Sequence, residues 1–246
     1  MASSFSFHFD VDGSGAQHSC AKDARAASLQ QETFAPAEEV FDSNDDTRLT
    51  DQLDDRNTDL VAGTYEGGLK VWECTVDLVA HLRRQHQRMD GKRALDVGCG
   101  HGIVGACAIN LGARCDFQDY NRQVLESATI PRIAAFDAGS RFFAGDWLAL
   151  CDYAPWGDDT YDVIMTAETL YAIDSMPRLL ALLKRRMAKP SGVAYVASKT
   201  YYFGVGGGTR QFEDLVREDG AMSSTVVWTT PGEGVKREIL MLQWVG

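Results

Sequence analysis

The stretch "LDVGCGHGIVG", positions 95–105, decides the fold prediction. The run that ends at Val97 suits a short buried strand, and glycines follow it at positions 98, 100 and 102. Residues 103–111 then have the composition of a helix, with Gly112 as its stop. Glycines in this place let the backbone come close to a ligand and let the helix pack on the strand. The stretch therefore predicts a strand, a ligand-binding turn and a helix in direct succession.

Strand and helix patterns alternate on both sides of this unit. Apolar residues at helical spacing predict an amphipathic helix over 69–86. Further strands are expected over 115–121, 141–147, within 161–171 and over 192–199, with helices at 122–128, 177–187 and about 209–218. Two consecutive strands, "STVVWTT" and "REILMLQWV", follow the last helix. We therefore expect an α/β domain over 57–246 with a seven-stranded, mostly parallel sheet and a C-terminal antiparallel hairpin. The expected layout resembles the Rossmann-like fold of class I methyltransferases.

The first 56 residues differ from the rest of the chain. They hold twelve Asp or Glu residues against four Lys or Arg residues and few aliphatic ones. This composition predicts an acidic, largely disordered arm that the fold does not need. Within it, "FSFHFDV" (5–11) alternates phenylalanine with polar residues, which is a strand period. A sticky tail and a strand that docks on the domain both remain open for this segment.

Composition excludes several classes of function. The formal net charge of −11 argues against direct nucleic-acid binding, which needs a basic face, but suits a basic protein partner. No apolar run is long enough for a membrane span, and no secretory signal is visible. The six cysteines form no CxxC pair and lie near no histidine cluster, so we expect no metal and a reduced, cytoplasmic or nuclear setting.

Two acidic residues indicate which ligand the glycines meet. Gly100, Gly102 and Gly105 fit a GxGxxG pattern, so a nicotinamide dinucleotide must be considered. Asp96, ahead of the first glycine, is expected to point into the site, where it would repel a pyrophosphate and attract the ammonium group of S-adenosylmethionine. Asp119 ends the second strand and suits the ribose hydroxyls of either cofactor. The balance favours S-adenosylmethionine, with a dinucleotide and a purely structural turn as alternatives.

The third strand ends in "AGDW" (144–147), where the adenine lies in this fold. Asp146 could accept the exocyclic amine of the base, and Trp147 could cover the ring. The alternative is that Trp147 is a core tryptophan.

The segment "TYEGGLKVWECT" (64–75) resembles the signature of the protein-histidine N-methyltransferases that modify a large-subunit ribosomal protein. The resemblance continues through "LDVGCG", "FQDYN", "GDW", "AETLY" and "SKTYYFGVGGG", and the N-terminal "FSFHF" shares it. Related lysine methyltransferases carry a "DxxY" box where this chain has "ETLY" (168–171), which favours the histidine branch. His101 stands where the family is expected to have a small residue, and we expect it to be a local hydrogen bonder.

The resemblance implies a set of cofactor contacts. The methionine and sulfonium end would be lined by Val71, Trp72, Glu73, Cys74 and Thr75. Gly98, with Gly100 beside it, would meet the cofactor through the backbone. Ribose and adenine would be held by Gln118, Asp119, Tyr120, Gly145, Asp146 and Trp147. Ala167 would sit beside the cofactor at the end of the fourth strand.

A second glycine-rich stretch, "SKTYYFGVGGGTRQF" (198–212), follows the fifth strand. No Lys-Ser or Lys-Thr pair follows its glycines, so it is not a Walker-type phosphate loop. At this end of a methyltransferase sheet it would face the acceptor. Tyr202 and Phe203 are predicted to wall a substrate channel. Four glycines would let a peptide backbone lie close: Gly204, Gly206, Gly207 and Gly208. The alternative is a flexible turn with buried rings.

These observations predict an S-adenosylmethionine-dependent protein-histidine N-methyltransferase that acts as a monomer on a basic ribosomal protein. The resemblance implies methylation of the tele ring nitrogen. Neutral imidazole is already nucleophilic, because its unperturbed pKa is about 6.5, so a strong base is unnecessary. Glu168 and Tyr171 are the candidates for fixing the tautomer and stabilising the developing charge, although Glu168 could be purely structural. The alternatives are a protein-lysine methyltransferase of the same superfamily and a catalytically silent binding module.

Overall fold

The computed structural model describes residues 7–9, 60–61, 65–66, 68–85, 88–135, 137–153, 156–204 and 206–246. Most of the predicted acidic arm over 1–56 lies outside these residues. The exception is β1 (Phe7–Phe9), which falls within the segment expected to be a tail or a docking strand.

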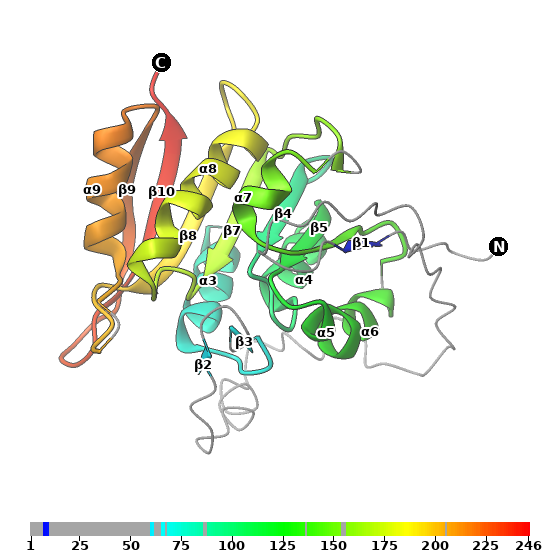
Figure 1. Ribbon diagram of the computed structural model, residues 1–246, viewed down its shortest axis with the longest axis horizontal. Helices are drawn as coiled ribbons and strands as arrows, with labels where there is room; N and C mark the ends of the chain where they lie inside the picture. The colour runs from blue at the N-terminus through cyan, green and yellow to red at the C-terminus, as the bar shows by residue number, and fades with distance from the viewer. Residues whose placement is uncertain are drawn as a thin grey trace.

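An eight-stranded sheet runs through the described part of the chain (Figure 1). Its order is β1-β6-β5-β4-β7-β8-β10-β9. The strands are β6 (Phe142–Ala144), β5 (Arg114–Asp119), β4 (Arg93–Val97), β7 (Val163–Ala167), β8 (Val193–Lys199), β10 (Arg237–Trp244) and β9 (Met222–Thr229). These seven strands pair in parallel except at β10, which is antiparallel to both β8 and β9, so the predicted seven-stranded, mostly parallel sheet with a C-terminal antiparallel pair is confirmed. β1 adds an eighth strand at the edge.

Three short strands lie outside these seven. β1 lies parallel to β6 at the edge, with Phe7 opposite Phe142. β2 (Leu60–Val61) and β3 (Tyr65–Glu66) pair with each other as a separate two-stranded sheet.

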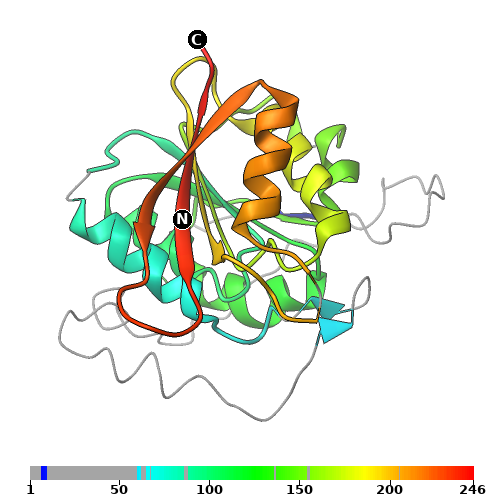
Figure 2. The same ribbon diagram turned by 90° about the vertical axis from the view of Figure 1, so that its left-hand side faces the viewer.

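Helices cover both faces of the sheet (Figure 2). One face carries α3 (Glu73–Arg84), α4 (Ile103–Asn110), α5 (Arg122–Val124), the π-helical turn η1 (Leu125–Thr129) and α6 (Ile130–Ala134). The other carries α7 (Trp147–Cys151), the 3₁₀ turn η3 (Ile173–Ser175), α8 (Met176–Arg186) and α9 (Thr209–Asp219). Among the described residues, no helix is both long enough and apolar enough to cross a bilayer.

Alternation along the strands divides the buried side chains into two cores. Ala94 packs with Leu78 and Ile103 in the core under α3 and α4. The next residue, Leu95, packs with Leu179 in the core under α8. Both faces are therefore apolar, which explains why the central strands read as nearly continuous hydrophobic runs.

The helix expected over 69–86 begins later than predicted. Trp72 has an extended backbone, with φ −99° and ψ 156°, and α3 begins at Glu73. The amide of Cys74 in its first turn donates to Oε1 of Glu168 at 3.3 Å, just beyond β7. This contact ties the first turn of α3 to the carboxyl end of the sheet, where the functional site lies.

Candidate active site

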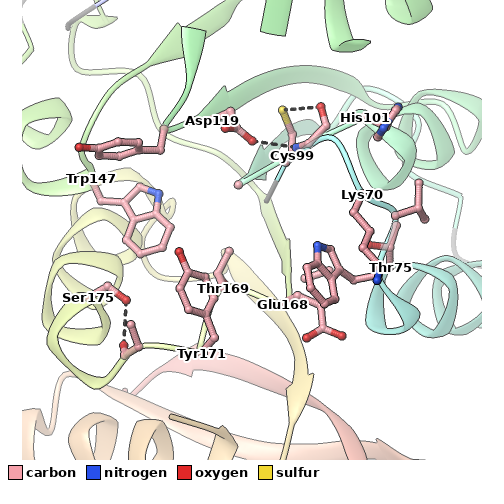
Figure 3. A pocket seen from close by; sticks show the side chains of 18 of the residues that line it. Lys70, Thr75, Cys99, His101, Asp119, Trp147, Glu168, Thr169, Tyr171 and Ser175 are labelled. Carbon is pink, nitrogen blue, oxygen red and sulfur yellow. Dashed lines mark hydrogen bonds between the residues drawn. The ribbon is translucent and has the colours of Figure 1, made fainter. Parts of the chain in front are cut away.

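A cavity of about 430 Å³ lies at the carboxyl ends of the parallel strands (Figure 3). It lies near β4 and β7, the two neighbouring strands between which the order of strands in the sheet reverses. Open α/β sheets bind their ligands at this position. Thirteen of the predicted site residues line it: Val71, Trp72, Thr75, Gly98, Gly100, Asp119, Tyr120, Asp146, Trp147, Ala167, Glu168, Tyr171 and Tyr202. Segments far apart in the sequence thus meet around one space.

The first glycine loop, residues 98–102, forms one wall of the cavity. Its three glycines have positive φ angles of 61°, 51° and 70°, a conformation that other residues rarely adopt. A Cβ atom on Gly98 would lie 2.6 Å from Cγ2 of Thr169. A Cβ atom on Gly100 would lie 2.9 Å from the carbonyl oxygen of Gly68. The loop therefore needs glycine for its turn and for the segments that close over it.

Asp119 holds this loop in place from the end of β5. Its carboxylate accepts the Gly100 amide at 2.9 Å and the Asn121 amide at 3.0 Å. Its side chain is directed to the cavity wall, as predicted for a group that meets a ribose (Figure 3). A carboxylate has about four lone-pair sites, so it can bind the loop and ligand hydroxyls together.

The expectation that Asp96 points into the cavity is wrong. Strand alternation places it on the same face as Ala94, under α4, and it is only 2% exposed. Its Oδ2 accepts the amide of Gly105 at 2.8 Å. That amide belongs to the first turn of α4, whose amides have no partner within the helix. Burial, together with the nearby charge of Asp119, raises the pKa of Asp96 well above its usual range.

Gln118 also lies behind the cavity wall and does not line it. Its Oε1 accepts from the Gly98 amide at 3.2 Å and from the Trp147 indole at 2.9 Å. Its Nε2 donates to the carbonyl of Gly145 at 3.0 Å. Instead of meeting ribose or adenine as predicted, Gln118 fixes the backbone and the ring that do line the space. Gly145 is buried beside it.

Asp146 and Trp147 shape the cavity at the end of β6. Asp146 caps α7 by accepting the Leu148 amide at 2.9 Å, and it pairs with Arg178 at 2.7 Å. The indole of Trp147 faces the cavity (Figure 3). Its position suits the predicted cover for a planar base, and the half-buried ring also packs against the core under α8.

Two residues predicted to meet the cofactor lie outside the cavity at the start of α3. The Glu73 carboxylate pairs with Lys199 at 3.5 Å. The Cys74 side chain is fully buried, and burial raises the pKa of its thiol.

Glu168 combines burial, charge and an unusual backbone. Its φ of 60° is the only positive value at a non-glycine position in the described part of the chain. Its carboxylate accepts the Cys74 amide and the hydroxyl of Tyr202. Left-handed conformations at non-glycine residues cost about 1–3 kcal/mol and cluster at active sites. Together with its place in the cavity wall, this makes Glu168 the strongest candidate for a reacting-group contact.

The second glycine loop, residues 204 and 206–208, was predicted to line a substrate channel, but its glycines do not line the cavity. A Cβ atom on Gly207 would lie 2.2 Å from the carbonyl oxygen of Leu170. A Cβ atom on Gly208 would lie 2.2 Å from that of Thr200. These two glycines are buried and serve close packing of one backbone on another. Gly204 is exposed, and the Phe203 side chain outside the cavity is 84% exposed.

The sequence argument missed several residues that line the cavity: Gly68, Lys70, Cys99, Ile103, Thr169, Ala172, Asp174, Ser175, Arg178 and Lys199. Five of the ten follow β7, and Lys199 is the last residue of β8. His101 also lines the cavity, and its ring lies 3.0 Å from the carbonyl oxygen of Leu69. This hydrogen bond joins the loop to a segment 32 residues earlier and is not the local one expected from the sequence. Within the described ranges, no cluster of three or more His, Cys, Asp or Glu residues could hold a metal.

Comparison with known proteins decides the family. Residues 76–223 match a family model described as a methyltransferase domain. The chain belongs to the methyltransferase family. The structure of magnesium protoporphyrin IX methyltransferase from Synechocystis, solved with bound SAH, is similar to this chain, with a TM-score of 0.55 and 13% sequence identity. The similarity covers 85% of this chain and 98% of that one. At that identity the likeness shows the shared fold alone.

Curated relatives of this methyltransferase carry a more specific name. Histidine protein methyltransferase 1 homolog from Dictyostelium discoideum is 38% identical over 163 residues, which cover 65% of this chain and 52% of that protein. The Bos taurus protein of the same name is 35% identical over 211 residues, with coverage of 74% and 56%. The predicted resemblance to protein-histidine methyltransferases is confirmed. The chain spans about half the length of these relatives.

Proposed function

We propose that the chain is an S-adenosylmethionine-dependent protein-histidine N-methyltransferase. The observation that carries the proposal is a buried carboxylate, Glu168, in the wall of a cavity whose other end suits a nucleoside. The name of the curated relatives supports the same acceptor.

The cavity has the groups that this cofactor requires. Asp119 suits the ribose hydroxyls, the Trp147 ring suits the adenine, and the first glycine loop lets the amino-acid part lie against the backbone. Val71 and Trp72, just before α3, and Thr75, in its first turn, line the same cavity. When bound, S-adenosylmethionine supplies a methyl group on a sulfonium, which a nitrogen lone pair can displace. The chain's task is to align that nitrogen and to exclude water.

The acceptor side of the cavity is built for a neutral ring with one N–H. A histidine in its neutral form has a lone pair on one nitrogen and a hydrogen on the other. The Glu168 carboxylate can accept that hydrogen and stabilise the positive charge that develops in the ring. Tyr171, drawn between Trp147 and Glu168 in Figure 3, is a second polar group of the cavity lining. A lysine would first have to lose a proton, for which Glu168 would have to act as a base.

The finer features of the proposal concern the partner. The net charge of −11 favours approach of a basic protein, such as a large-subunit ribosomal protein. We extend the proposal to the tele nitrogen of the histidine, to a monomeric enzyme and to a cytoplasmic and nuclear location.

Mass spectrometry of methylated ribosomal proteins tests the function. The chain is incubated with these proteins and methyl-labelled S-adenosylmethionine, with Asp119→Ala as the control that loses the cofactor. Label on a histidine supports the proposal, and the position of the methyl group on the ring tests the tele assignment. Label on a lysine would favour the related lysine enzymes. Cofactor binding without any transfer would indicate a silent binding module.

A further inference from the structure

We propose that Tyr202 is a positioning residue, and that a chain of hydrogen bonds from Ser198 through Tyr202 to Glu168 turns the carboxylate toward the N–H of the acceptor ring. This inference rests on the proposed function and names the groups that orient its substrate. It gives Tyr202 a role different from the channel wall predicted from the sequence.

The three side chains are in direct contact at the carboxyl ends of β7 and β8. The hydroxyl of Tyr202 donates to Oε2 of Glu168. The Oγ of Ser198 lies 2.9 Å from the same hydroxyl, and the amide of Lys199 donates to it at 3.4 Å. Ser198 is fully buried and Glu168 is 8% exposed. The contacts are therefore screened from water at one end and open to the cavity at the other.

The direction of the hydrogen bonds follows from the single hydrogen of a phenol. Tyr202 gives its hydrogen to Glu168, so its oxygen must accept from Ser198 and Lys199. Burial, and next the charge of Glu168, raise the pKa of Tyr202, so the phenol keeps its hydrogen at neutral pH. The chain therefore runs one way, from Ser198 to Tyr202 to Glu168.

The two oxygens of Glu168 are held by two different segments of the chain. Oε2 accepts from Tyr202, and Oε1 accepts from the Cys74 amide at 3.3 Å, in the first turn of α3. Fixed in this way, the carboxylate offers the cavity an acceptor and no donor. It therefore selects a ring nitrogen that carries a hydrogen and leaves the lone pair of the opposite nitrogen facing the methyl group.

In the transfer step, one bond forms and one bond breaks while Glu168 keeps its hydrogen bond to the ring. The lone pair of one ring nitrogen forms the new N–C bond, and the C–S bond breaks with its electron pair left on sulfur. The other nitrogen keeps its hydrogen bond to Glu168 while the ring becomes positive. That hydrogen then leaves as a proton, to the carboxylate or to water, and the neutral methylated ring results.

The second glycine loop explains why Tyr202 stays in place. The Tyr202 amide donates to the carbonyl of Gly207 at 2.8 Å, and the Gly206 amide donates to the carbonyl of Tyr202 at 2.9 Å. Gly207 in turn packs on the backbone of Leu170 and Tyr171. The loop thus holds Tyr202 and the segment after Glu168 as one unit.

Steady-state kinetics of Tyr202→Phe tests the proposal, because this change removes the hydroxyl and keeps the ring. We expect kcat for a histidine-containing acceptor to fall about 10- to 30-fold, roughly 1.4–2 kcal/mol. The acceptor KM should stay within about threefold and the Kd of S-adenosylmethionine within about twofold. Ser198→Ala, one step further away, should lower kcat by about threefold. The matched control is Tyr195→Phe, also on β8 but outside the cavity lining, which should leave all three constants unchanged.

A double-mutant cycle separates positioning through Glu168 from an independent role. If Tyr202 acts through the carboxylate, Tyr202→Phe should cost less than about twofold once Glu168→Gln is present. Losses that multiply in the double variant, or an unchanged kcat in Tyr202→Phe, would overturn the inference and leave the proposed function intact. A wild-type chain that binds the cofactor but methylates no histidine would overturn the proposed function itself. If Tyr202→Phe does not fold, the same cycle is run with Ser198→Ala.

Discussion

The two glycine-rich loops look alike in the sequence but do different work in the structure. The first glycine loop follows β4, turns through three positive φ angles and lines the cavity. The second follows β8, and its last two glycines are buried against the backbone of neighbouring segments. Both loops need glycine where another segment of the chain packs against them, but only the first loop also lines the cavity.

The comparison shows what a glycine cluster can and cannot indicate. A missing Cβ permits close approach, but the sequence does not say what approaches. The acidic residues do not decide it alone either, because Asp119 reaches the cavity and Asp96 lies beneath α4. The following predictions test each loop for the partner that the structure gives it.

The largest effect is expected from Gly207→Val. Its side chain would overlap the carbonyl oxygen of Leu170 and the backbone of Tyr171, which cannot move as a flexible side chain can. We expect a loss of about 3 kcal/mol in the free energy of unfolding, which lowers Tm by about 6–12 °C. Histidine transfer in the folded fraction should fall at least about tenfold, because Tyr202 moves with the loop.

Gly204→Ala is the control for this change in the same loop. Its φ of 86° is positive, but a Cβ atom there would meet nothing within 4 Å. Only the backbone strain of about 1–2 kcal/mol is expected. Equal losses of Tm in the two variants would show that backbone strain, and not packing on Leu170, is what the loop avoids.

Asp119→Ala should act on the first loop and on the cofactor. The variant removes the acceptor for Gly100 and for the ribose hydroxyls. The Kd of S-adenosylmethionine, measured by titration calorimetry, should rise about 30-fold, or about 2 kcal/mol. Asp119→Asn keeps one acceptor oxygen and should lose less. A larger change in the acceptor KM than in the cofactor Kd would contradict the assignment of the first loop to the cofactor.

Phe203→Ala tests the exposed part of the second loop. The ring is 84% exposed beside Tyr202, so its removal should change the free energy of unfolding by no more than about 0.5 kcal/mol. If the ring meets the incoming protein, the acceptor KM should rise about fivefold, close to 1 kcal/mol, while the cofactor Kd stays the same. The control is Val245→Ala, 58% exposed near the C-terminus. An unchanged acceptor KM would limit the role of this loop to holding Tyr202.

Local patterns predicted the sheet and the first glycine loop well. Each strand, each helix and the turn at Gly98 depends mainly on neighbouring residues, so the sequence contains the signal. Asp119 was also predicted to reach the site, because it ends a strand at the edge where ligands bind.

Features that depend on distant segments were predicted poorly. The side of β4 on which Asp96 lies is set by where α4 packs, and the partner of Gly207 is a segment 36 residues earlier, at Tyr171. Arg178 and Lys199 reach the cavity only because β7 and β8 end beside it. No spacing within the chain marks such contacts.

The smallest expected effect is a change in how the free energy of unfolding depends on pH in Asp96→Asn. Asparagine keeps an oxygen that can accept the Gly105 amide, so the variant should fold. The pKa of Asp96 is raised in the folded protein, chiefly by burial. The folded state therefore holds the Asp96 proton more tightly than the unfolded state does. The stability that this proton contributes is complete below the pKa of Asp96 in the unfolded state, and it is lost as pH rises through the pKa of Asp96 in the folded state. Asparagine cannot titrate, so the free energy of unfolding of Asp96→Asn relative to the wild type should increase with pH above about 4. Urea unfolding at several pH values measures this difference, and Asp137→Asn at an exposed turn controls for a general charge effect. A difference that shrinks with rising pH would mean that the ionised carboxylate stabilises the first glycine loop, and that Asp96 acts there as a charge after all.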